Sequence, residues 1–127
     1  MIVGMGLDLV EIDRVQHMID SLGDRMYARL FSETEANYIR NKPLPAQHAA
    51  VRLAAKEAAF KALAGNELAR RITWRDVEVV SDRQGIPSIK LHGTAHRRAR
   101  ELGVSRIHVS LTHSRDTAAA VVVLTSG

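Results

Sequence analysis

The chain has 127 residues, 46% of them apolar and none of them cysteine, so one domain over residues 1–127 can bury a core without disulfides or thiolate sites. Its formal net charge of +4 favours an anionic partner, and nucleic acid, a nucleotide-like ligand or an acidic protein would all suit it. The longest apolar run has seven residues, against roughly 20 for a membrane-spanning helix, and the N-terminus lacks the features of a signal peptide. We therefore expect a soluble, cytoplasmic protein with no membrane partner.

The first elements in chain order are a strand and a helix. Residues 2–10 alternate between two faces, as a β-strand does. One face is apolar and consists of Val3, Met5, Leu7 and Leu9. The other carries mostly small or polar residues and consists of Gly4, Gly6, Asp8 and Val10. Asp8 thus lies beside two glycines, where backbone or a ligand can come close. A helix is predicted over residues 11–20, with Arg14 and Met18 on or near its outer face.

Two more helices follow. Ser32 with Glu35 three positions later forms a capping box, which predicts a helix through Tyr38. The longest helical segment covers residues 47–64, and Gly65 with Asn66 supplies its stop signal. Small residues that could pack closely on a sheet gather on one side of it: Val51, Ala54, Ala55, Ala58, Ala59 and Ala62. Charged residues stand among apolar ones on the other side: Arg52, Lys56, Glu57 and Lys61.

The second half of the chain reads as two hairpins around a helix. Residues 74–81 and 87–91 are strand-like and flank a turn, a helix fits 94–102, and a second hairpin joins 107–112 to 117–124. This order predicts an α+β fold, with a largely antiparallel sheet packed against the long helix.

Asp8 is the strongest chemical signal. An acid within an apolar strand is costly to bury unless it is paired, hydrated or bound to a cation. Two carboxylates on rigid elements, with room for water and phosphate oxygens, are what Mg²⁺ requires, since it prefers oxygen ligands and seldom has a cage made of protein alone. Arg52, Lys56 and Lys61 could then neutralise phosphates. The simpler alternative is that Glu57 and Lys61 form an ordinary stabilising pair one helical turn apart.

Motifs along nearly the whole chain carry a family resemblance. They are Gly6-Leu7-Asp8-Leu9-Val10-Glu11-Ile12, Phe31 with Glu35 and Tyr38, Arg52 to Ala58, Trp74 with residues 76–79, Gly85 with Pro87, and His108 to His113. In this order they resemble the acyl carrier protein synthases of the 4′-phosphopantetheinyl transferase superfamily. The pairing of a Gly-x-Asp strand with an Ala-Lys-Glu-Ala helix is specific.

The resemblance implies an activity, its ligands and its site residues. The 4′-phosphopantetheine of coenzyme A would pass to a serine of apo acyl carrier protein, with release of 3′,5′-ADP, at a Mg²⁺ site made by Asp8 and Glu57. The general base could be Glu57, a metal-bound water or Lys61. Candidate coenzyme A contacts are Arg52, Lys56, Gly65 and His113. Candidate carrier contacts are Arg14, Met18 and Arg25. The family fold also implies a homotrimer with active sites between subunits.

Some positions depart from the family pattern. Leu53 stands where members usually have an aromatic residue, Val51 replaces a glycine and Thr117 replaces a tyrosine. Ser114 stands where many members have an acid. The loop after the long helix, which is usually Gly-Thr-Gly-like, runs here from Ala64 to Arg71 and contains one glycine. Neither proposed metal ligand is among them. A nucleic-acid-binding module is the main rival, but the chain has only one Trp, two Tyr and two Phe and no stacking motif, so we expect no nucleic-acid partner. The intact Asp8 and Glu57 argue against a catalytically silent relative.

Overall fold

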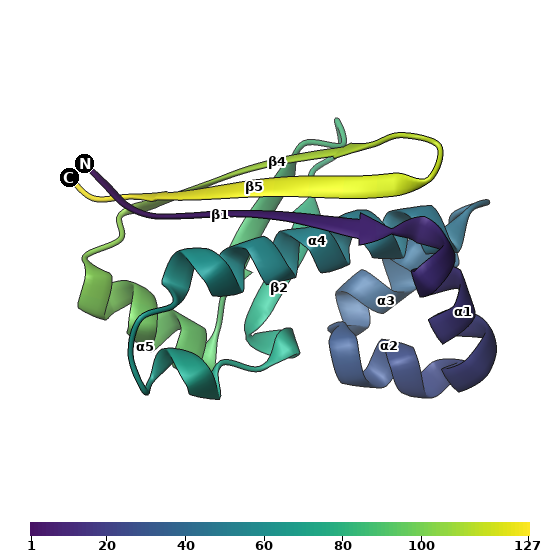
Figure 1. Ribbon diagram of the computed structural model, residues 1–127, viewed down its shortest axis with the longest axis horizontal. Helices are drawn as coiled ribbons and strands as arrows, with labels where there is room; N and C mark the ends of the chain where they lie inside the picture. Colours follow the sequence, from purple (N-terminus) through teal and green to yellow (C-terminus); the bar gives the residue numbers. More distant parts are fainter.

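The computed structural model describes residues 1–127 and contains a three-stranded antiparallel sheet above a long helix (Figure 1). The sheet order is β1 (Ile2–Glu11), β5 (Thr117–Thr125), β4 (Arg106–His113). The two chain ends lie side by side, because the Met1 ammonium donates a 3.1 Å hydrogen bond to the Ser126 carbonyl. The predicted α+β class and antiparallel sheet are confirmed.

The helix α4 (Pro45–Leu63) packs directly on the inner face of this sheet. Two glycines of β1 permit the contact. A Cβ atom on Gly6 would lie 1.8 Å from the Ala58 carbonyl oxygen, and one on Gly4 would lie 2.2 Å from that of Ala62. The predicted small-residue side of α4 therefore meets strand backbone, and this close approach holds Asp8 of β1 against the helix.

Three shorter helices form one end of the molecule: α1 (Ile12–Leu22), α2 (Asp24–Leu30) and α3 (Glu33–Arg40). The predicted capping box of α3 is present, since Ser32 Oγ accepts from the Glu35 amide at 3.2 Å and Glu35 Oε1 accepts from the Ser32 amide at 2.8 Å. The helix α2 was not predicted from the sequence. It follows Gly23, whose φ of 54° interrupts the helical path, and no side-chain cap marks its first turn.

The remaining elements are the hairpin of β2 (Val77–Ser81) with β3 (Pro87–Leu91) and the helix α5 (Gly93–Leu102). The predicted strand from residue 74 is shorter, because η2 (Trp74–Asp76) is a 3-10 turn in which Asp76 Oδ2 accepts from the Thr73 amide at 3.0 Å. A second short turn, η1 (Ala69–Arg71), lies in the loop after α4. No helix in the structure is long and apolar enough to cross a membrane.

Lys56 lies in the core, which corrects the expectation that it contacts coenzyme A. Its ammonium donates to Glu35 Oε1 at 2.9 Å, to the Trp74 carbonyl at 2.8 Å and to the Val77 carbonyl, and its side chain is fully buried. Burial lowers the pKa of Lys56, while the Glu35 charge opposes that shift. The Glu35 carboxylate also accepts from the Val79 amide at 2.9 Å. The pair therefore joins α3, α4 and β2 and leaves Lys56 no way to reach a ligand.

The outer face of β1 and β5 is apolar and uncovered. Met5, Leu7 and Leu9 of β1 are 59%, 63% and 65% exposed, and they stand beside Val121 and Val123 of β5, which are half-buried. An exposed apolar row of this extent is typical of a surface that another protein covers.

Candidate active site

Asp8, Glu57 and Lys61 meet where β1 crosses α4. Asp8 Oδ1 accepts a 2.8 Å hydrogen bond from Lys61 Nζ, which also donates to the Leu7 carbonyl at 3.0 Å. Asp8 Oδ2 is buried and has no hydrogen-bond partner. Arg14 of α1 reaches to 3.9 Å from Glu57 Oε1. The structure therefore brings together the two predicted metal ligands and the two candidate bases.

The two carboxyl groups differ in acidity. Burial and the neighbouring Asp8 carboxylate raise the pKa of Glu57 to about 7, against the opposing charges of Arg14 and Lys61. For Asp8, burial raises the pKa, but the adjacent Glu57 and the Lys61 ammonium more than offset it, so the pKa lies below its ordinary value. Near neutral pH, Asp8 is thus a carboxylate and Glu57 exchanges a proton readily.

This pair suits a divalent ion that also binds substrate oxygens. The structure contains no cluster of three or more His, Cys, Asp or Glu side chains that could hold a metal ion alone. Mg²⁺ ordinarily uses one or two carboxylates, with water and substrate phosphates as its other ligands. The unpartnered Asp8 Oδ2 beside Glu57 fits that requirement.

A second cavity, of about 330 Å³, surrounds Arg52 on the β4 side of α4. The Arg52 side chain is buried, with its guanidinium 4.1 Å from the centre of the Tyr38 ring and an Nη2 hydrogen bond of 3.1 Å to Ser81 Oγ. Its Nε has no partner. Lys42 lies over the same ring, 4.5 Å from its centre. A buried cation with an unused donor is suited to an anionic group.

His113 lines the same cavity and has a defined hydrogen-bonding arrangement. Its Nε2 lies 2.8 Å from the Gln47 amide nitrogen, and its Nδ1 lies 3.3 Å from the Ser114 carbonyl. A neutral ring with the proton on Nδ1 satisfies both contacts, since Gln47 then donates to Nε2. His108 points to the opposite face of β4, as its phase on the strand predicts, and contacts Thr125 Oγ1 at 3.1 Å. No local pattern marks Gln47, because its role depends on a contact with a residue 66 positions away.

The carboxylate pair and the Arg52 cavity lie on opposite edges of the sheet. Asp8 is on β1 and His113 on β4, with β5 between them, so their strands are roughly 10 Å apart by the usual strand spacing. Arg52 and Glu57 are five residues apart on α4, which separates them by roughly 140° around the helix axis. The two halves of the candidate site thus open on different sides of the chain.

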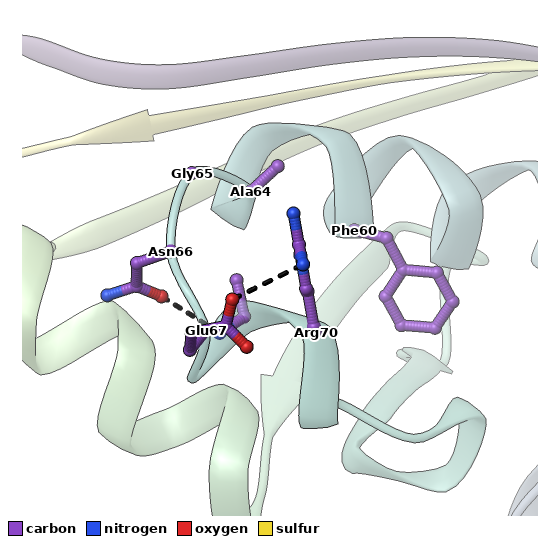
Figure 2. A pocket seen from close by; sticks show the side chains of 7 residues that line it. Phe60, Ala64, Gly65, Asn66, Glu67 and Arg70 are labelled. Atoms are coloured by element: carbon purple, nitrogen blue, oxygen red, sulfur yellow. Dashed lines mark hydrogen bonds and ion pairs between the residues drawn. The ribbon is translucent and has the colours of Figure 1, made fainter.

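A third cavity, of about 680 Å³, lies at the C-terminal end of α4 and is bounded by the loop that contains Gly65 (Figure 2). Arg70 rises from η1 between this loop and the ring of Phe60, and it pairs with Glu67 at 3.2 Å. Phe60 lies one turn after Glu57, so it borders this cavity on the same side of α4 as the carboxylate pair.

The predicted carrier contacts lie on α1 and α2. Arg14 and Arg25 are exposed, whereas Met18 is half-buried against the core. Arg25 lies in a shallow cavity of about 440 Å³ with Leu22, Ala28 and Arg29. Of these residues, Arg14 lies next to the Glu57 carboxylate.

Residues 4–122 match the family model of the 4′-phosphopantetheinyl transferase superfamily. Two holo-[acyl-carrier-protein] synthases, from Solidesulfovibrio magneticus and Geobacter sulfurreducens, are 46% and 45% identical to the chain, with 98% of each chain covered.

Solved structures show the same likeness. The chain matches the holo-[acyl-carrier-protein] synthase of Neisseria meningitidis with a TM-score of 0.86 and 26% identity, covering 99% of this chain and 100% of the other. It matches that of Bacillus anthracis, in complex with CoA (3′,5′-ADP), with a TM-score of 0.79 and 31% identity, covering 100% and 99%.

Proposed function

The chain belongs to the 4′-phosphopantetheinyl transferase superfamily, and from this membership we propose that it is a holo-[acyl-carrier-protein] synthase that transfers 4′-phosphopantetheine from coenzyme A to a serine of apo acyl carrier protein. The observation that carries the proposal is the buried, unpartnered oxygen of Asp8 beside Glu57 and Lys61. The chain would act in the cytoplasm, where its lack of cysteine is unremarkable.

In this reaction the oxygen of the carrier serine bonds to the β-phosphorus of coenzyme A, and the bond from that phosphorus to the bridging oxygen breaks, so that 3′,5′-ADP leaves. Asp8 and Glu57 would hold Mg²⁺, which supplies positive charge to the pyrophosphate oxygens. Glu57 or Lys61 would accept the serine proton. As an ammonium, Lys61 would instead neutralise a phosphate.

The Arg52 cavity supports a role in binding the nucleotide end of coenzyme A. Arg52 presents a buried guanidinium with an unused Nε donor, and Lys42 adds a second positive charge. His113 lines the same cavity and could donate to a phosphate oxygen once Gln47 gives up its contact and Nε2 carries a proton. Gly65 would contact the remainder of coenzyme A from the third cavity.

A mass-spectrometric assay tests the proposed function. Apo carrier protein incubated with the chain, coenzyme A and Mg²⁺ should gain the mass of one phosphopantetheine, and 3′,5′-ADP should appear in equal amount. Chelation of Mg²⁺ with EDTA should stop the reaction, and added Mg²⁺ should restore it. A carrier of unchanged mass in the complete mixture would refute the proposal.

The assembly we propose is a homotrimer with active sites shared between subunits. The two halves of the site lie on opposite edges of one sheet, and the outer face of β1 and β5 is apolar and uncovered. If a neighbour covered that face, the carboxylate pair of one copy could lie opposite the Arg52 cavity of the next.

Met5→Glu is expected to convert the trimer to monomer, because it places a charge in the uncovered row on the outer sheet face. Transfer should fall with the trimer, while the circular dichroism spectrum stays that of a folded chain. Sedimentation velocity gives the mass, and Met5→Leu is the matched control that should remain trimeric. A wild-type chain that sediments as a monomer, or a trimeric Met5→Glu chain, would contradict this assembly.

Arg14→Glu is expected to raise the KM for the carrier far more than the KM for coenzyme A, because Arg14 is exposed beside the site. Because Arg14 also pairs with Glu57, Arg25→Glu tests carrier binding more directly. We expect Arg25→Glu to raise the carrier KM about tenfold, the order of magnitude for loss of one interfacial charge contact. Arg97→Glu, an exposed arginine of α5 at the other end of the molecule, is the control. Equal changes in both KM values would count against carrier docking here.

A further inference from the structure

Arg98 is a buried charged residue with no part in the proposed reaction. It lies on α5 beside the exposed Arg97 and Arg100, yet only 8% of Arg98 itself is exposed. A buried arginine requires acceptors for its donors, and here they are found on another element.

The acceptors belong to the end of α4 and to α5 itself. Arg98 Nε donates to the Leu63 carbonyl at 2.7 Å, Nη2 to the Ala64 carbonyl at 3.0 Å and Nη1 to Glu101 Oε1 at 3.1 Å. The last carbonyls of a helix have no partners within it, and a cation there also suits the helix dipole. Arg98 thus terminates α4 with a planar fork of donors that a lysine could not reproduce.

The next residues depend on the same contact. Gly65 has a φ of 128°, and a Cβ on it would lie 3.2 Å from Arg98 Nη2. Asn66 Nδ2 donates to Glu101 Oε1 at 2.9 Å, while Asn66 Oδ1 accepts from the Ala69 amide at 2.9 Å. Figure 2 shows Asn66 turned toward α5. The loop at the end of α4 is therefore fixed by side chains of α5.

We propose that Arg98 is a positioning residue for coenzyme A, which holds the loop at Gly65, together with Glu101 and Asn66, in the shape that binds it. The inference rests on the proposed function. The loop forms a wall of the 680 Å³ cavity next to Phe60, so its shape decides what the cavity accepts. A loop that adopted other conformations would raise the apparent dissociation constant in inverse proportion to the fraction of time spent in the binding shape.

Arg98→Lys tests the proposal, since it keeps the charge and loses the fork. We expect the KM for coenzyme A to rise about tenfold, as for a loop that is in its binding shape one tenth of the time. The kcat and the carrier KM should change less than twofold. Hydrogen exchange of the amides at residues 64–68 should accelerate in the free protein. Arg97→Lys, the exposed neighbour, should change neither quantity.

Glu101→Ala is the second variant, because it breaks the bridge to Asn66 at an exposed position and does not depend on Arg98→Lys folding. It should also accelerate loop exchange and raise the coenzyme A KM. Unchanged exchange and an unchanged KM for coenzyme A in Glu101→Ala would overturn the proposal. So would a loss of kcat with no change in KM. An inactive wild-type chain would instead refute the proposed function, and the exchange measurement distinguishes the two failures.

Discussion

Asp8→Asn is expected to reduce kcat at least a hundredfold, the order found when one charge-stabilising group is removed from an active site. The amide keeps the shape of the carboxylate but loses the charge that pairs with Lys61 and that would hold Mg²⁺. Glu57→Gln should have a comparable effect, since it removes the second ligand and a candidate base. Transfer of radiolabelled phosphopantetheine to the carrier measures the rate.

Glu11→Gln is the matched control, because Glu11 is an exposed carboxylate at the end of the same strand. Thermal unfolding should show all three variants folded, and titration calorimetry should show weaker Mg²⁺ binding only for Asp8→Asn and Glu57→Gln. Near-normal transfer by either of these two would mean that the carboxylate pair is not the reaction centre.

Gly6→Ala is expected to lower the free energy of unfolding by about 3–5 kcal/mol, the upper range for single substitutions. The added Cβ would overlap the Ala58 carbonyl oxygen, and neither the strand nor the helix backbone can yield without moving apart. That movement would also separate Asp8 from Glu57. Urea unfolding monitored by circular dichroism measures the change.

Gly103→Ala separates steric from conformational cost. Gly103 has a φ of 74° at the end of α5 and open space where a Cβ would go, so we expect a loss of only about 1 kcal/mol there. Gly6 has no positive φ, so its role is to leave room for α4. Equal losses in the two variants would refute the close-packing explanation.

The sequence predicted well those features that depend on neighbours along the chain. The capping box at Ser32 and the alanine side of α4 are local patterns, and both are present in the structure. Asp8 stood out because an acid in an apolar strand needs a partner, and the family resemblance supplied Glu57. Their meeting at the β1–α4 crossing agrees with that expectation.

Lys56 was expected to contact coenzyme A and is buried instead, and Arg98 is buried beside exposed arginines, because the sign of a charge does not indicate where its acceptors lie. Those of Lys56 come from Glu35 and two carbonyls 18 and 21 residues away. Those of Arg98 include carbonyls 34 and 35 residues earlier. Both residues lie in helices with charged neighbours, so no local pattern marks them as buried. Only the packing of distant elements identifies them.

The position of β5 between β1 and β4 affects how the chain can fold during synthesis. β1 is made first, yet its only strand partner is β5, which begins at Thr117 and ends at Thr125. Until those residues leave the ribosome, β1 cannot join the sheet, and Asp8 has no fixed place beside Glu57. Such long-range pairing slows folding, and a chain cut short by ten residues would lack most of β5. Asp8 can therefore take its place beside Glu57 only after residues 117–125 have been made.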